Sequence, residues 1–430
     1  MDKTQQSDTA VDSATVEMDG AFVIANLPSQ GAWRTRAQEV VAAGGHALVD
    51  HVGGAVEAHD YWVRLGADQA RALVGDAGRV VVVCPTVQDA DVARATRLLR
   101  TAGHVVGSET TSPAEAVAAA AVGASFVIVR GLEAGGFVSE ASVSVLLRAT
   151  RAALDAAGFT AVQMVAWGGA GLDSTAALRL LGAAGVVLSD QLLLAEDAPT
   201  SASLRDRLAG FNPADTAQLG RRFGRRLRVY GQLGTRPPRE MAKLEAGGDA
   251  PAFWREVGAR IATNCVDPDL KSELLPLGQD AALAVPMAAL GKTCDIVRAV
   301  HLQTLEILDG VQQRFALAPG EGISKVNGTA LPVHQGPMAQ TSDTPAFALA
   351  VAESGGMPWL ALGNMPPHIA EQTIAQTKAL LGDRPFGAGI IGLDANPHRD
   401  AHIEIMARLK PTFALVAAGT AEQALTVEAT

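Results

Sequence analysis

The chain has 430 residues, of which 48% are hydrophobic and 19% are charged, so it can bury large cores and wholesale disorder is excluded. Its net charge of -10 argues against nucleic acid as a partner, because a surface that binds phosphates would be basic. The start lacks the layout of a signal peptide and no apolar run approaches about 20 residues, which predicts a cytoplasmic protein without a membrane span.

Short apolar runs alternate with helical segments through the first half of the chain. The runs that predict strands are residues 21–27, 46–52, 80–84, 104–108, 125–130, 161–167 and 185–190. Such continuous runs are typical of parallel strands that are buried on both faces. Strand–helix–strand repeats at this spacing favour a (β/α)8 TIM barrel, with one degenerate strand between Gly53 and Gly78. A doubly wound, flavodoxin-like sheet is the structural alternative.

Strand periodicity is lost from residue 211, and helical stretches replace it. Within this part, residues 220–228 (GRRFGRRLR) carry five arginines in nine residues. A solvated helix face explains this stretch better than a docking patch for an acidic partner, which is the alternative.

A faint internal duplication relates the end of the chain to its beginning. Pro28 and Pro337 are 309 residues apart, and Gly45 and Gly356 are 311 apart, so the offset is nearly constant. Four predicted strands follow from residue 331. Together these features predict the first half of a second barrel.

The sequence therefore predicts four parts. They are a flexible lead-in (1–20), a degenerate TIM barrel (21–210), a mainly helical insert or linker (211–330) and an incomplete second barrel (331–430). Because half a barrel leaves its last strand unpaired, we expect the natural product to continue beyond Thr430, unless strands of the first copy complete the second.

Glycine-rich loops follow several of the predicted strands. They are VRGLEAGG, AWGGAG and HQGPMAQ, and Ser189 follows another strand. In a barrel, the chemistry lies at the carboxyl ends of the strands. Glycine amides can approach a phosphate closely, although tight turns explain any one pair equally well. Two such loops on successive strands favour a phosphate-bearing cofactor.

The combination IVRGLEAGGFVS, VAWGGAGLDSTAALRLLGAAGVVLSD, PVHQGPMAQTSD and SGGMPWLALGN resembles the FMN-dependent nitronate monooxygenase family (2-nitropropane dioxygenases). Related enoyl reductases occur in polyketide and polyunsaturated fatty acid synthases, and the tandem arrangement is similar to such modules. The resemblance implies a flavoprotein oxidoreductase of the nitronate monooxygenase or enoyl reductase type. Its expected partners are a small-molecule or carrier-bound acyl substrate and other synthase domains.

The resemblance also assigns contacts with FMN. Gly135 and Gly136 would lie near the isoalloxazine and ribityl chain, and Gly168, Gly169 and Ser189 would hold the phosphate. The contacts from the second copy would be Gly336, Pro337 and Met338 beside the flavin ring, with Asn364 as a polar contact.

Phe137 departs from the family, which usually has a histidine directly after EAGG as the acid or base. Phenylalanine cannot transfer a proton, so no catalytic residue is assigned and negligible nitronate oxidation is expected. His398, Asp400 and His402 lack a third ligand in metalloprotease spacing, so no metal is predicted.

Two other hypotheses remain beside the FMN-dependent enzyme. One is a non-catalytic tandem pseudo-barrel that acts as a scaffold or docking module in a megasynthase, which Phe137 favours. The other is a phosphosugar enzyme on the same barrel, which would share the phosphate cradle but not the EAGG and QGPM motifs.

Overall fold

The computed structural model describes residues 23–50, 61–75, 78–232, 235–313 and 318–428. The chain divides into two compact units, Met1–Leu308 and Asp309–Thr430, and each is described by itself. The predicted lead-in (1–20) lies outside the described residues, as do residues 21–22 and 51–52 of the first two predicted strands.

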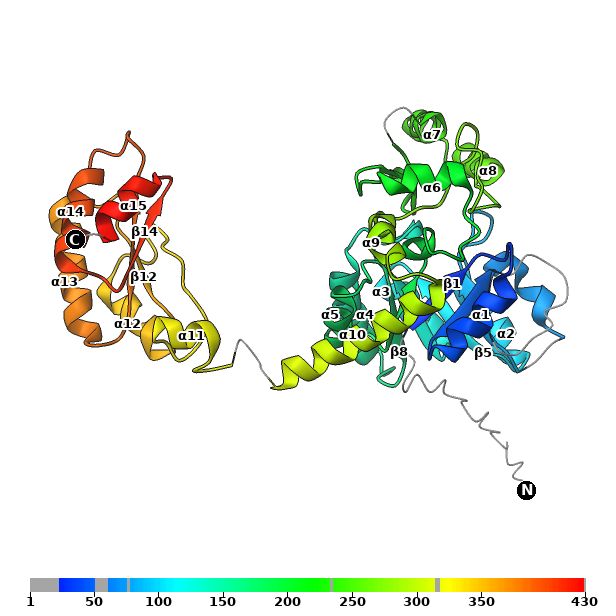
Figure 1. The fold of residues 1–430 in the computed structure, drawn as a ribbon, viewed down its shortest axis with the longest axis horizontal. Coiled ribbons are helices and arrows are strands. Elements are labelled where there is room, and N and C mark those ends of the chain that lie inside the picture. The colour runs from blue at the N-terminus through cyan, green and yellow to red at the C-terminus, as the bar shows by residue number, and fades with distance from the viewer. Residues whose placement is uncertain (1–22, 51–60, 76–77, 233–234, 314–317, 429–430) are drawn as a thin grey trace, which may run out of the picture. The chain divides into compact units, whose positions relative to one another are not determined.

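The first unit contains a closed barrel of eight parallel strands, which confirms the predicted TIM-barrel class (Figure 1). In barrel order the strands are β1 (Val23–Leu27), β2 (His46–Asp50), β3 (Trp62–Gly66), β4 (Val80–Cys84), β5 (Val105–Thr110), β6 (Phe126–Arg130), β8 (Gln163–Trp167) and β9 (Gly185–Leu188). Pairing of β1 with β9 closes the barrel. The expected degenerate strand is β3, and the 3-10 helix η1 (Ala67–Leu73) follows it.

Alternation along each strand divides the core into an inner and an outer part. Val82 and Ile128 belong to the cluster inside the barrel. Val81 and Val83 belong instead to an outer cluster, where Leu99 of a covering helix packs on them. Because successive side chains of a strand point to opposite faces, a strand of valines can serve both parts.

Helices cover the outside of the barrel. They are α1 (Trp33–Ala42), α2 (Val92–Thr101), α3 (Pro113–Ala121), α4 (Val143–Ala156) and α5 (Ser174–Leu180). The start of α3 shows why these segments are helical. Ser112 Oγ accepts a hydrogen bond from the Glu115 amide, and Pro113 occupies the first turn, where no amide donor is needed.

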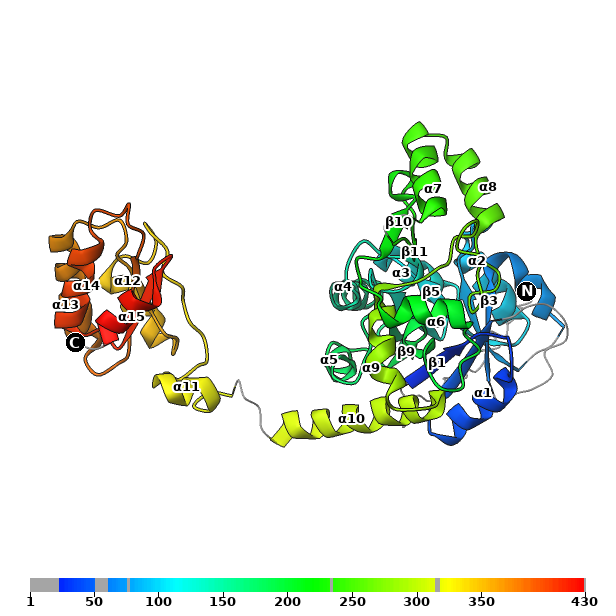
Figure 2. The same cartoon turned by 45° about the horizontal axis from the view of Figure 1, so that its top comes forward.

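The chain after the barrel remains within the first unit up to Leu308, which lies within the last helix, α10, and this part includes both helices and strands. These elements are η2 (Asp190–Leu192), α6 (Ala202–Ala209), β10 (Thr216–Leu219), η3 (Arg221–Phe223), β11 (Arg226–Tyr230), α7 (Arg236–Gly247), α8 (Ala250–Arg260), η4 (Gln279–Leu283), α9 (Ala284–Ala288) and α10 (Thr293–Gln313). Strands β10 and β11 form an antiparallel sheet with β7 (Gly136–Val138), which directly follows the EAGG loop. In both views α7 and α8 lie at one end of this unit, beyond the barrel strands (Figures 1 and 2).

The arginine-rich stretch at residues 220–228 forms η3 and most of β11, so the interpretation as a helix face is wrong. Arg228 is buried, and its guanidinium donates to the Leu132 carbonyl and to Thr216 Oγ1. Strand pairing with β7 orders this segment, and this long-range contact has no local sequence signal.

The second unit holds a parallel three-stranded sheet, β12 (Trp359–Ala361), β13 (Gly387–Ile391) and β14 (Phe413–Ala417). Its helices are α11 (Gly322–Asn327), α12 (Pro345–Glu353), α13 (Pro367–Leu381), α14 (Arg399–Leu409) and α15 (Ala421–Glu428). The sequence predicted four strands here, but the first is present only as a parallel bridge between His334 and Met357. No helix in the described part of either unit is long and apolar enough to cross a membrane.

Candidate active site

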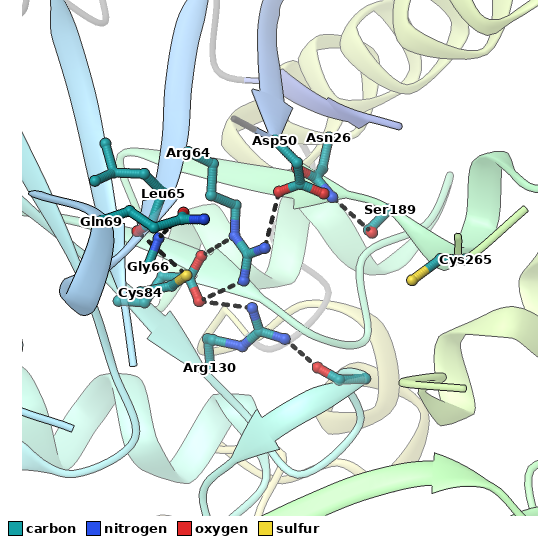
Figure 3. A network of polar contacts seen from close by, with 12 residues as sticks. Asn26, Asp50, Arg64, Leu65, Gly66, Gln69, Cys84, Arg130, Ser189 and Cys265 are labelled. Carbon is teal, nitrogen blue, oxygen red and sulfur yellow. Dashed lines mark hydrogen bonds and ion pairs between the residues drawn. The ribbon is translucent and has the colours of Figure 1, made fainter. Parts of the chain in front are cut away.

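Polar and aromatic side chains gather where the barrel strands end. Because parallel strands present their carboxyl ends at one face of a barrel, successive strands each contribute to this mouth. The mouth holds a cavity of about 430 Å³. Its lining includes Asn26, Asp50, Arg64, Cys84, Arg130 and Ser189 (Figure 3), and also Trp167.

A buried carboxylate shared by two arginines forms the floor of the mouth. Arg64 donates from Nε and Nη2 to the Glu109 carboxylate at 2.5 and 3.1 Å, and Arg130 Nη1 donates to it at 2.7 Å. Arg64 Nη1 also donates to Asp50 Oδ1 at 2.9 Å (Figure 3). Burial alone would raise the pKa of Glu109, but the two guanidinium charges outweigh it and lower this pKa. Glu109 is therefore ionised, and the two positive and two negative charges balance.

Arg130 connects this floor to the EAGG loop. Its guanidinium carbon lies 4.0 Å from the centroid of the Trp167 ring, a cation–π geometry. Its Nη2 donates to the Gly135 carbonyl. The loop is thus held by the same side chain that neutralises Glu109.

The absence of side chains at the EAGG glycines allows another segment of the chain to pack closely against this loop. A Cβ on Gly135 would lie 2.8 Å from the Gly278 nitrogen and 2.9 Å from Asp190 Oδ2, so any side chain there would collide. The Gly278 amide donates to Asp190 Oδ2 at 2.6 Å. A glycine is therefore required at position 135 because the extended segment before η4 packs directly against its backbone.

The predicted phosphate cradle binds a carboxyl group of the chain itself. Gly169 has a φ of +67°, and its amide donates to Asp280 Oδ1 at 2.7 Å. Asp280 is only 3% exposed, and its Oδ2 is buried with no hydrogen-bond partner among the described residues. A Cβ on Gly168 would lie 3.2 Å from Glu133 Oε2. The Gly168–Gly169 turn, which the resemblance makes a phosphate nest, thus has Asp280 bonded to one of its two amides.

Two carboxyl groups here have raised pKa values. Burial raises the pKa of Asp280 well above its usual range, and the neighbouring Asp190 and Glu133 carboxylates raise it further. Burial likewise raises the pKa of Asp190 to about 6. The cause is mainly the loss of water around groups that would otherwise be charged.

Ser189 lies at the mouth cavity but is already hydrogen-bonded. Its hydroxyl accepts from Asn26 Nδ2 at 3.2 Å (Figure 3), and its amide donates to Gln191 Oε1 at 2.9 Å. Ser189 therefore joins the ends of β1 and β9.

Phe137 packs within the antiparallel sheet. It pairs with Leu227 across β7 and β11. The guanidinium carbon of Arg225 lies 4.3 Å from its ring centroid, and the Trp254 ring centroid lies 5.9 Å away. Phe137 also lines the mouth cavity, so an apolar ring stands where the resemblance leads us to expect an acid or base.

The other four predicted flavin contacts belong to the second unit. Pro337 packs against β13, where a Cβ on Gly389 would lie 2.9 Å from Pro337 Cγ. The Met338 amide donates to Ser342 Oγ at 2.6 Å. Gly336 and Asn364 are exposed, as is the Met338 side chain. The nine predicted site residues are therefore divided between the two units.

No metal site is found among the described residues, where no group of three or more His, Cys, Asp and Glu side chains could hold an ion. His402 Nε2 lies 2.9 Å from the Met365 carbonyl, and this hydrogen bond gives the buried ring a structural role.

Sequence reasoning missed the charged floor and the two acidic side chains near the glycines. Arg64 interrupts the apolar strand β3, and Glu109 and Arg130 lie at the ends of the buried strands β5 and β6; an ionisable residue in a buried strand is a signal that was available. Asp280 is 111 residues away from Gly169, and no local pattern joins them.

The chain is similar in structure to FabK from Thermotoga maritima, with a TM-score of 0.54, 19% identity, and coverage of 68% of this chain and 96% of that chain. A nitroalkane oxidase from Streptomyces ansochromogenes matches with a TM-score of 0.47 and 19% identity, and the match covers 67% of this chain and 97% of that chain. The enoyl reductase domain of MlnA, from the macrolactin biosynthesis cluster of Bacillus amyloliquefaciens, matches with a TM-score of 0.47 and 10% identity. That match covers 68% of this chain and 96% of that chain. The FabK match confirms the suspected resemblance at the level of the fold. No family model and no curated protein matches the chain.

An FMN phosphate does not fit the cradle in this arrangement. A phosphate carries negative charge and needs free amide donors, as helix N-termini and nests provide. Here the Gly169 amide is bonded to Asp280, and the Glu133 and Asp190 carboxyl groups stand close by. A phosphate would have to displace Asp280 and then meet the remaining acidic side chains.

Replacing the shared carboxylate should destabilise the barrel. Glu109→Gln leaves Arg64 and Arg130 buried without their anion, and we expect a loss of about 3–5 kcal/mol in the free energy of unfolding. Urea unfolding at neutral pH measures this. The control is Glu371→Gln, which breaks an exposed pair with Arg408 and should change stability little. Equal, small effects in both variants would show that the network is not structural.

The raised pKa of Asp280 should make stability depend on pH. The folded chain holds the Asp280 proton more tightly than the unfolded chain, so the stability that Asp280 contributes is fully present below about pH 4 and is lost as the pH rises through the folded pKa. Asp280→Asn keeps an acceptor for Gly169 but cannot ionise. We expect its melting temperature to fall less between pH 4 and pH 8 than that of the unmodified chain. Asp190 contributes a similar fall to both proteins up to about pH 6. Parallel pH curves would contradict this account of Asp280.

Proposed function

We propose that the first unit is a non-catalytic barrel of the flavin-dependent oxidoreductase type, which serves as a scaffold module within a polyketide or fatty-acid synthase. The carrying observation is the Asp280 carboxyl group on the Gly169 amide, where the resemblance requires a phosphate. The motifs quoted above and the fold shared with FabK support the type of barrel. The motif resemblance alone supports the synthase context.

Three further features support a barrel without chemistry of its own. Phe137 offers no proton at the position where the resemblance implies a histidine. The charged groups on the floor are paired with one another, so none of Arg64, Glu109 and Arg130 is left to act on a substrate. Segment 275–278 packs over the EAGG loop and reduces the space available there.

A second candidate is an FMN-dependent oxidoreductase, and the mouth cavity favours it. Its volume of about 430 Å³ lies within the range of small-molecule sites, and Gly135, Gly136, Trp167 and Ser189 line it. A bound flavin would supply hydride transfer there. This function requires Asp280 to leave the Gly169 amide first.

Flavin content distinguishes the two candidates. We expect the purified full chain to be colourless and to bind added FMN with a Kd weaker than about 1 mM in equilibrium dialysis, because the phosphate donors are occupied. With FMN present, we also expect no turnover of a simple nitronate. A yellow protein with one FMN per chain and a micromolar Kd would overturn the scaffold proposal in favour of the enzyme.

A further inference from the structure

A second and larger cavity lies beside the mouth, with a volume of about 780 Å³. Helices α3 and α4 form one side of it, and η3 with the start of β11 forms another. Phe137 lines both cavities, so its ring stands between the outer cavity and the barrel mouth. The outer cavity does not include Gly168, Gly169 or Ser189, and it is therefore separate from the predicted flavin contacts.

Three arginines from the 220–228 stretch line this outer cavity. Arg225 is held in place, because it stacks on Phe137 and on Trp254 and donates to the Thr86 carbonyl at 2.7 Å. Arg226 donates to Glu140 Oε2 at 2.5 Å. Arg221 is exposed, and among the described residues its guanidinium bonds no acceptor. A positioned arginine beside an unbonded one offers several N–H donors to an anion without a large ordering cost.

An apolar floor runs beneath these arginines. Val145 and Ala149 are four residues apart on α4 and therefore share a face, and Ala118 of α3 lies in the same cavity. Val145 is 60% exposed, which is unusual for a valine inside a hollow. An apolar ligand that covered this floor would remove its surface from water.

The acidic side chains of the cavity are already engaged. Glu109 is bonded to Arg64 and Arg130, and Glu140 to Arg226. Glu115 Oε2 accepts from the Thr111 amide and hydroxyl. Asp91 caps α2 through the amide of Arg94. Glu109 and Glu140 are thus neutralised by arginines, whereas Glu115 keeps its charge and acts on Arg225, so the carboxylate of an anion that bonds Arg221 and Arg225 must lie away from Glu115.

We propose that the outer cavity is a binding site for an organic anion with an apolar body, of the medium-chain carboxylate class. The carboxylate would lie between Arg221 and Arg225, and the alkyl body would lie on the α3–α4 floor. This site does not depend on the state of the barrel mouth, so it exists whether or not the mouth binds a flavin.

Calorimetric titration of the full chain with decanoate tests the proposal. We expect one decanoate per chain, at an affinity at least tenfold above that of decan-1-ol or decyltrimethylammonium, because only the carboxylate can form charge-assisted bonds with arginine. Arg221→Ala should weaken decanoate binding about tenfold. Arg239→Ala removes an exposed arginine from α7, outside the cavity, and should leave binding unchanged.

A second pair of variants locates the apolar body. Val145→Asp places a negative charge on the floor and should abolish decanoate binding, whereas Leu180→Asp changes an equally exposed residue of α5 and should not. Thermal melting confirms that both variants fold. The proposal is overturned if decanoate does not bind, if decan-1-ol binds equally well, or if the two aspartate variants bind decanoate alike.

Discussion

The hydrogen bond from the Gly169 amide to the Asp280 carboxyl group ties two loops together beside the barrel mouth. It joins the loop after β8 to η4 across 111 residues, and the adjacent Gly278 packs directly on the EAGG backbone. Because one amide N–H has one strong acceptor at a time, a phosphate and Asp280 cannot both occupy this nest. The same glycines that would permit a cofactor to approach therefore permit the chain to fold over itself. At this loop a side chain, Asp280, therefore occupies the amide that a phosphate would bond.

The charged groups of the first unit differ between the barrel mouth and the surface around it. On the floor, Glu109 and Asp50 together balance the charges of Arg64 and Arg130, so the interior of the mouth has little net attraction for an anion. Near the nest, buried Asp190 and Asp280 hold their protons more tightly than exposed carboxyl groups do. Outside the mouth, Arg221 of the 220–228 stretch is exposed and bonds no acceptor among the described residues. The anion site that we propose is therefore in the outer cavity rather than at the glycine loops.

The sequence predicted the barrel well because its strands are continuous apolar runs, which both faces of a covered parallel sheet require. Strand β3 was hard to place because Arg64 interrupts it and a 3-10 helix follows it. Strand β10 was missed because it has only four residues, and β11 was missed, although its arginines alternate with Leu227 and Val229, because its pairing with β7 is long-range. The glycine pairs could be located in the sequence, but their contacts could not. Whether the Gly169 amide bonds a ligand or Asp280 depends on a tertiary contact that the sequence does not show. The lack of an acid or base at position 137, by contrast, follows directly from the phenylalanine there.

The central claim is that Asp280 excludes a phosphate from the Gly168–Gly169 nest. The most direct test measures FMN and riboflavin binding to the unmodified chain and to Asp280→Ala, with folding of both confirmed by thermal melting. Riboflavin has the same ring system but no phosphate, so the ratio of the two affinities reports the phosphate alone. The account predicts a ratio near one for the unmodified chain and a gain of at least tenfold for FMN over riboflavin in Asp280→Ala. A strong preference for FMN that is already present in the unmodified chain, and unchanged by the substitution, would contradict it.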